Sequence, residues 1–199
     1  RYFQCFENDD IAIPFAKLKR KDSQYKSIND YLPEDKQGIW IDIFPYDNLI
    51  NDGLRGTLHF YLTMMNHLQL YDKYNQNPSL DSIGKRVLFF LIRFKNIFIS
   101  LPRLNKRINK LHNKYNSIST EYVTNYDCNC GSIVKRNIWK KESLEKRVLH
   151  KFENQMCYIP KEYDAILTKS YGNYMELPPE EDRHPTHHLE KLKFPKEYK

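Results

Sequence analysis

The stretch GIWIDIFPYDNL, residues 38–49, holds the clearest strand pattern in the chain and an unexpected charge within it. Successive residues alternate between two faces, so the isoleucines of 39–44 fall on one side and Trp40, Asp42 and Phe44 on the other. The pattern predicts a buried strand. A buried carboxylate costs several kcal/mol unless a counter-charge, a hydrogen-bond donor or a metal ion compensates it. Asp42 is therefore expected to have such a partner.

The chain before this strand offers cations that could serve Asp42. Residues 11–20, IAIPFAKLKR, predict another strand with a basic end, on which Lys17 and Lys19 share one side. Lysines beside an acidic metal site suit phosphate binding, because they offset the charge of a nucleotide or phosphodiester. Lysines also occur at ordinary surface strand ends, so the local pattern leaves both interpretations open.

Two later polar segments repeat these residue types. Lys135 and Arg136 follow GSIV, and an Arg can bind a phosphate with two parallel hydrogen bonds. Residues 178–188, PPEEDRHPTHH, combine His and carboxylates, which are common metal ligands. Their spacing matches no familiar ligand pattern and Pro185 interrupts it, which favours a solvated or substrate-edging loop.

The middle of the chain changes to a helical period. Residues 55–74, 83–100 and 104–115 predict three helices, which are interpreted as scaffold. The apolar stripes expected to face the core are Leu58, Tyr61, Leu62, Met65 and Leu68 in the first helix, and Leu104, Ile108, Leu111 and Tyr115 in the third. A shorter helix is expected at 159–172, with a proline in its first turn and Gly172 at its end.

Size and composition predict one globular domain with a basic surface. The 199 residues suit a single domain, and 40% hydrophobic with 29% charged residues is a globular composition. The net charge of +7 favours anionic partners such as phosphates, nucleotides, anionic lipids or nucleic acids, without choosing among them. The cysteines have neither disulfide-framework nor zinc-knuckle spacing and are interpreted as reduced thiols: Cys5, Cys128, Cys130 and Cys157.

The chain opens without a secretory signal, which favours a cytoplasmic protein. Its most apolar run, VLFFLIRFKNIFISL at 87–101, is too short for a transmembrane helix and contains Arg93 and Lys95. A core-facing helix is the favoured interpretation of this run. A basic amphipathic face resting on a membrane surface stays open as the alternative.

Three segments together resemble the LicD family of phosphotransferases. They are PFAKLKRK at 14–21, GIWIDIFPYDNL at 38–49 and residues 152–188, which include IPKEYDAILTKSYGNYMELPPEE. The resemblance implies an α/β (α+β) fold of the nucleotidyltransferase-like kind, a small mixed sheet flanked by helices. It also implies a single domain over residues 1–199, with a helical insertion at about 54–116.

The same resemblance implies a reaction. LicD-like enzymes transfer phosphocholine or a similar phospho-alcohol from a CDP-linked donor, such as CDP-choline, to a hydroxyl of a cell-surface glycan of the teichoic acid or lipopolysaccharide type. A divalent ion, Mg2+ or Mn2+, would bridge the donor phosphates and stabilise charge at the transferred group. The implied partners are a CDP-alcohol and a glycan acceptor, met in the cytoplasm or through a peripheral contact with the inner face of the membrane. No nucleic-acid partner is expected.

Carried over residue by residue, the resemblance makes Asp42 a metal ligand or a base for the acceptor hydroxyl. The other implied contacts are Lys17 and Lys19 with the donor phosphates, Lys135 and Arg136 with the nucleotide, and Pro178, Pro179 and Glu180 at the edge of its pocket. Asp47, just after Pro45, is expected to hold the turn.

One departure from the family pattern is large. Family members begin with a glycine-containing segment that leads to a cluster of aspartates, the principal metal ligands. Nothing in this chain corresponds, because ENDD at 7–10 lacks both the hydrophobic strand frame and the glycine turn. We therefore expect the chain to be the C-terminal portion of a longer transferase with little activity alone, since a single carboxylate binds a divalent ion weakly.

Two other functions fit the charge. A non-catalytic module could bind anionic glycans or lipid headgroups through the lysine-rich helices at 83–115, and basic charge would also suit a nucleic-acid binder. In either module Asp42→Asn should leave affinity unchanged, whereas in a transferase it should destroy turnover. Charge reversal at Lys106, Arg107 and Lys110 should instead abolish binding by such a module.

Overall fold

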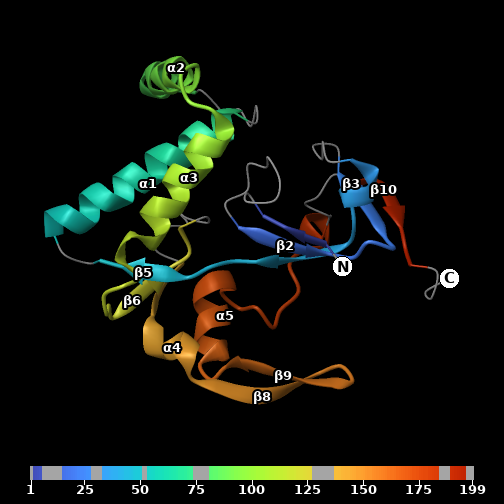
Figure 1. Ribbon diagram of the computed structural model, residues 1–199. Coiled ribbons are helices and arrows are strands. Elements are labelled where there is room, and N and C mark those ends of the chain that lie inside the picture. The colour runs from blue at the N-terminus through green and yellow to red at the C-terminus, as the bar shows by residue number, and fades with distance from the viewer. Residues whose placement is uncertain are drawn as a thin grey trace. The chain divides into compact units, whose positions relative to one another are not determined.

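The computed structural model describes residues 2–5, 15–27, 33–50, 53–73, 81–126, 137–183 and 189–195. These residues form helices and small antiparallel sheets that are not arranged in alternation, so the fold class is α+β, as expected (Figure 1). The chain divides into two compact units, the first formed by Arg1–Phe44 with Glu176–Lys199 and the second by Pro45–Met175.

The first unit is built on two small sheets. Strand β2 (Ala16–Lys19) pairs with β1 (Tyr2–Gln4) on one side and with β4 (Trp40–Ile43) on the other, all antiparallel. Strand β3 (Gln24–Ser27) pairs with β10 (Leu189–Lys193) near the other end of the chain. Gly38 leads into β4, and a Cβ there would lie 2.4 Å from the Arg20 carbonyl oxygen, so a glycine is needed for this close approach.

The expectation of a buried strand at 39–44 is wrong. Ile41 is 64% exposed and Ile43 is 45% exposed. The reason is the place of β4 in the sheet order β1-β2-β4, where it forms an edge of only three short strands. Apolar alternation is typical of a strand, but a sheet this small leaves its outer strand largely open to solvent.

The second unit contains the three expected helices: α1 (Gly53–Lys73), α2 (Ile83–Asn96) and α3 (Leu101–His112). Its three-stranded antiparallel sheet has the order β5 (Asp47–Leu49), β6 (Tyr122–Thr124) and β7 (Ile138–Lys140). The short α4 (Lys141–Glu145) then leads into a hairpin of β8 (Arg147–Phe152) and β9 (Gln155–Pro160). Helix α5 (Tyr163–Tyr171) follows.

Two local expectations are confirmed and one is shifted. On α3, Leu104, Ile108 and the nearby Tyr115 are at most 4% exposed, so this apolar stripe does face the core. Helix α5 ends at Gly172, whose φ of 73° suits a glycine. The helix begins later than expected, because Pro160 belongs to strand β9 instead of a first helical turn.

Helix α1 turns the opposite face inward from the one its apolar pattern predicts. Leu58 and Tyr61 are 58% and 55% exposed. The buried residues of the helix are instead Gly56, His59, Thr63, Asn66, His67, Gln69 and Leu70. Gly56 explains part of this choice, since its Cα lies against the Ile50 carbonyl where a Cβ would be only 2.4 Å from the oxygen.

Helix α2 buries only a narrow face. Phe89, Ile92 and Asn96 are its buried residues, and the helix packs against α1. Most of its large apolar side chains are exposed, so the interpretation of 87–101 as a wholly core-facing helix is wrong. Within the part of the chain that the structure describes, every helix is too short or too polar to cross a bilayer.

Candidate functional site

Lys17 is the partner that Asp42 was expected to have. The two residues face each other across strands β2 and β4, and Lys17 Nζ lies 3.4 Å from Asp42 Oδ1. The Lys17 side chain is 17% exposed and that of Asp42 is 34% exposed. An ion pair at this depth contributes at most about 1 kcal/mol to stability. The ion pair with Lys17 therefore compensates the charge of Asp42 but adds little to the stability of the fold.

Trp40 gathers both lysines of β2 onto one side of the sheet, as the alternation predicted. Lys17 Nζ lies 4.1 Å from a Trp40 ring centroid and Lys19 Nζ lies 5.8 Å away. Both contacts have the geometry of a cation held over an aromatic face. Tyr25 meets the same indole edge-on at 4.8 Å between centroids, which supports its orientation. Two ammonium groups and one carboxylate thus lie around one indole.

This arrangement can attract an anion such as a phosphate through its ammonium groups. It does not by itself make a metal site. Over the described ranges, no group of three or more His, Cys, Asp or Glu side chains is placed to hold a metal ion. A divalent ion needs several oxygen ligands, and Asp42 alone supplies too few. Binding of Mg2+ or Mn2+ here stays a prediction.

The other predicted site residues lie elsewhere or outside the described residues. Pro178 and Pro179 precede a short 3-10 turn at Glu180–Asp182, and all of these residues are exposed. The Arg183 guanidinium donates to the Pro178 carbonyl at 2.7 Å and steadies this turn. Lys135, Arg136 and the histidines of 184–188 lie outside the described residues.

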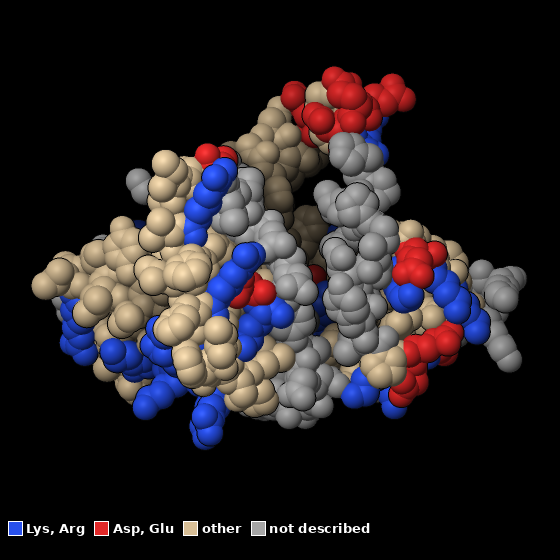
Figure 2. Space-filling model, turned by 90° about the horizontal axis from the view of Figure 1, so that it is seen from above, with Lys and Arg blue, Asp and Glu red and all other residues tan. Residues whose placement is uncertain are grey.

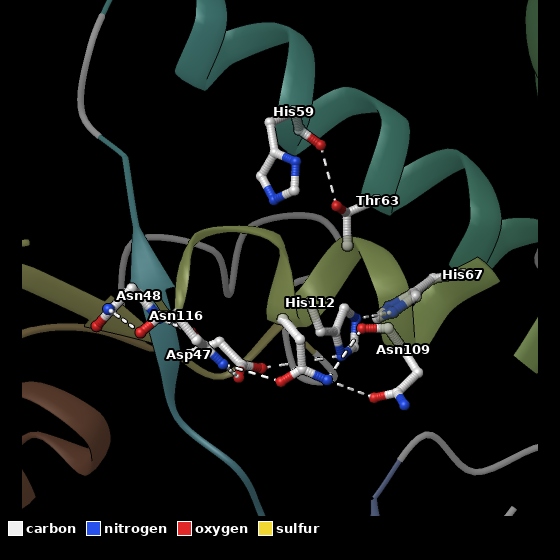
Figure 3. A network of polar contacts seen from close by, with 9 residues as sticks. Asp47, Asn48, His59, Thr63, His67, Asn109, His112 and Asn116 are labelled. Carbon is white, nitrogen blue, oxygen red and sulfur yellow. Dashed lines mark hydrogen bonds and ion pairs between the residues drawn. The ribbon is translucent and has the colours of Figure 1, made fainter. Parts of the chain in front are cut away.

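A buried polar network in the second unit was not predicted (Figure 3). Asn116 Nδ2 donates to Asp47 Oδ1 at 2.7 Å, and His112 Nδ1 lies 4.0 Å from Asp47 Oδ2. On its other side His112 Nε2 lies 2.9 Å from His67 Nε2. Asp47 was expected to hold a turn. It lies instead in strand β5, where it connects the strand to the end of α3.

One arrangement of protons in the neutral network is consistent with these contacts. One of the two facing Nε2 atoms must donate and the other accept. A hydrogen on His112 Nδ1 would point toward the Asp47 carboxylate, which leaves His112 Nε2 to accept from His67 Nε2. Both histidines are at most 4% exposed. The network is thus inaccessible to a substrate, and its role is to hold β5 and α3 against α1.

Burial controls the titration of these groups. It lowers the pKa of His67 to about 4, and together with the charges of His67 and His59 it lowers the pKa of His112 to about 3. Burial raises the pKa of Asp47, although the hydrogen bond from Asn116 opposes this effect. All three groups therefore favour their neutral forms more than they would in water.

His59 and Tyr126 extend the cluster through ring contacts. Their centroids are 5.6 Å apart, and Tyr126 also stacks on His112 at 5.3 Å. Among the described residues, neither ring nitrogen of His59 has a hydrogen-bond partner, and the Tyr126 hydroxyl has none either. Burial lowers the pKa of His59 and raises that of Tyr126.

A signal for this cluster was present in the sequence, because His59, Thr63 and His67 repeat every four residues along one helical face.

Comparison with known proteins finds a distant relative. The chain is 28% identical over 165 residues to the lipopolysaccharide cholinephosphotransferase LicD of Haemophilus influenzae (strain ATCC 51907 / DSM 11121 / KW20 / Rd). The alignment covers 78% of this chain but 57% of the relative, so the chain spans little more than half the length of that protein. No protein-family model matches the chain. No solved structure matches it either.

Proposed function

We propose that this chain is part of a transferase that moves phosphocholine, or a similar phospho-alcohol, from a CDP-linked donor to a hydroxyl of a cell-surface glycan. The observation that carries the proposal is the similarity to LicD over 78% of the chain. The relative's name specifies a cholinephosphotransferase acting on lipopolysaccharide, which makes CDP-choline the first donor to test and a lipopolysaccharide or teichoic acid glycan the acceptor. A nucleotidyltransferase-like arrangement of the α+β fold belongs to the same proposal.

The lysines and the carboxylate around Trp40 give the proposed reaction its groups. Lys17 would bind the diphosphate of the donor, since an ammonium group forms strong, charge-assisted hydrogen bonds with phosphate oxygens. Lys19 is only 4% exposed and would act on the same phosphates through its charge from behind Lys17. Asp42 would then stand close to those phosphates. The Asp42 carboxylate and a phosphate group that lie side by side repel each other unless a cation lies between them. The proposal therefore includes Mg2+ or Mn2+, with Asp42 supplying one ligand and further carboxylates supplied from outside the described residues.

The remaining predicted contacts complete the proposal. Lys135 and Arg136 would lie near the nucleotide, and Pro178, Pro179 and Glu180 would edge its pocket. A glycan acceptor that is built on a lipid would be met at the inner face of the membrane, which suits a cytoplasmic enzyme with a peripheral membrane contact.

The first test is a calorimetric titration of CDP-choline into the 199-residue chain, with and without Mg2+ or Mn2+. We expect weak binding that depends on Lys17, so that Lys17→Gln lowers the affinity by about fivefold to tenfold through loss of one charge-assisted contact. Lys151→Gln, which removes an exposed lysine from strand β8, is the matched control and should bind as the wild type does. Equal affinities of wild type and Lys17→Gln would contradict the proposed donor site.

Turnover tests the role of Asp42. In a transferase-active form of the protein, Asp42→Asn should lower kcat by about a hundredfold or more, the contribution typical of a positioned acid–base group. The same substitution should change the free energy of unfolding by no more than about 1 kcal/mol, since it removes one partly exposed ion pair. Turnover close to that of the wild type would remove Asp42 from the reaction.

A second candidate function, a non-catalytic module for anionic glycans or lipid headgroups, rests on the charge of residues 83–115. This stretch contains nine lysines and arginines and no aspartate or glutamate. Asp42→Asn separates the two functions. It should stop turnover in a transferase and leave ligand affinity unchanged in a binding module.

A further inference from the structure

Helix α2 has two apolar faces, and within the described part of the chain only one of them is buried. The buried face is the stripe of Phe89, Ile92 and Asn96, which packs on α1. On the opposite side a second stripe recurs every three or four residues and continues into the turn after the helix. Its members are 54% to 80% exposed and are Ile83, Val87, Phe90, Leu91, Phe94, Ile97 and Phe98.

So many large apolar side chains on one exposed helical face are unusual for a protein surface. Scattered exposed apolar residues are normal, but these align along the helix axis, and the rings of Phe94 and Phe98 touch at 5.5 Å between centroids. A face of this kind is typical of a site that binds a protein or a membrane.

Cations border this stripe. By helical spacing Arg86 and Arg93 lie along one side of it and Lys95 along the other. Arg93 is anchored by an ion pair with Asp72 at 2.9 Å, which fixes that border against α1. Long basic side chains beside an apolar stripe can keep their charges in a headgroup layer while the stripe enters the acyl boundary.

The neighbouring helix adds to this charge. The exposed side of α3 carries Arg103, Lys106, Arg107 and Lys110, and α2 and α3 contain no acidic residue. In Figure 2, blue side chains border a broad tan surface at the left of the view, where Figure 1 places α1, α2 and α3. A second copy would present the same cations and be repelled, whereas a surface of anionic lipid complements them.

We propose that the outer face of α2 binds the surface of a membrane containing anionic phospholipid. The helix has 14 residues, too few to span a bilayer, so it lies in the plane of the interface. Phe90 and Phe94 enter the acyl boundary at the centre of the stripe, while Arg86 and Lys95 remain with the lipid phosphates. This binding does not require transferase activity, although it would bring the proposed enzyme to a lipid-linked acceptor.

Co-sedimentation with vesicles tests the inference. The wild-type chain should sediment with vesicles of phosphatidylcholine and phosphatidylglycerol at least about tenfold more strongly than with phosphatidylcholine alone, because anionic headgroups attract the flanking cations. The double substitution Phe90→Ser with Phe94→Ser should lower the partition coefficient about tenfold or more by removing two inserted rings. Arg86→Glu with Lys95→Glu should remove the preference for anionic vesicles.

Phe152→Ser is the matched control, because it removes a phenylalanine that is 68% exposed on strand β8 and should leave vesicle binding unchanged. Thermal unfolding of each variant checks that folding is intact. Wild-type protein that stays in the supernatant with anionic vesicles would overturn the inference, as would equal binding by the double phenylalanine variant. Light scattering that shows a dimer dissociated by the same variant would assign the face to a second copy instead. Failure of CDP-choline binding with intact vesicle binding would count against the proposed function alone.

Discussion

The free energy of unfolding should fall steeply as the pH drops from about 6.5 to about 4, because the buried histidines resist protonation. His67 has a pKa of about 4 in the folded protein, against 6.5 for an unperturbed histidine. Between these values the unfolded chain binds a proton that the folded protein does not, so acid favours unfolding. Each pKa unit corresponds to about 1.4 kcal/mol, which makes the loss from His67 alone about 3 kcal/mol.

The geometry gives this loss a structural cause. Protonation of both His67 and His112 would place two N–H groups against each other at 2.9 Å between nitrogens, with no acceptor between them. His59 adds a third buried histidine with a lowered pKa. Asp47 acts in the opposite direction, because burial raises its pKa and the folded protein takes up that proton more readily than the unfolded chain. His67 and His112, whose pKa values are lowered to about 4 and about 3, set the direction of the net effect.

Denaturant unfolding at a series of pH values measures the effect. In His67→Gln the amide can still donate to His112 while no longer titrating, so the difference in stability between neutral and acid pH should shrink by about 3 kcal/mol relative to the wild type. His150→Gln removes an exposed histidine on β8 and should leave the pH dependence unchanged. Identical pH dependence in the wild type and His67→Gln would show that His67 does not carry the effect.

Asn48→Ala should destabilise the second unit by about 3 kcal/mol, since it leaves one buried and one part-buried carbonyl group without their donor. Asn48 is 6% exposed. Its Nδ2 donates to the Ile118 carbonyl at 2.7 Å and to the Tyr115 carbonyl at 3.2 Å. These bonds attach strand β5 to the segment that follows α3, so the substitution should loosen the connection between sheet and helices.

Urea unfolding of the wild type, Asn48→Ala and Asn173→Ala provides the comparison. Asn173 is exposed beyond the end of α5, and its replacement should change the free energy of unfolding by no more than about 0.5 kcal/mol. A loss below about 1 kcal/mol in Asn48→Ala would mean that water replaces the missing donor. In that case Asn48 would not be a structural anchor.

The amino-acid pattern was enough to predict features that depend on neighbouring residues. The three central helices lie where a period of three to four residues placed them, and the stripe of Leu104 and Ile108 on α3 is buried as expected. Lys17 and Lys19 share one side of their strand because alternation is built into an extended backbone. Gly172 ends its helix because its φ of 73° suits a residue without a Cβ.

Features that depend on contacts between distant segments needed the tertiary structure. Alternating apolar residues at 39–44 predicted a strand correctly, but burial depends on what covers it, and β4 forms an open edge. Asp42 could have been compensated by a metal ion, a hydrogen-bond donor or a cation, and only the pairing of β2 with β4 places Lys17 beside it.

The helices show most clearly that the local pattern and the tertiary contacts decide different features. On α1 the apolar stripe that includes Leu58 and Tyr61 faces solvent, because Gly56 fits against the backbone at Ile50 and His67 on the other face pairs with His112. On α2 two apolar faces compete, and packing against α1 leaves the outer one exposed. The sequence by itself determined the three central helices and the strands around Lys17 and Asp42, since local sterics and periodicity act within a few residues, but it did not indicate the hairpin of β8 and β9. The tertiary structure decided which face of each is buried, because that choice depends on hydrogen bonds and close contacts made by residues far apart in the chain.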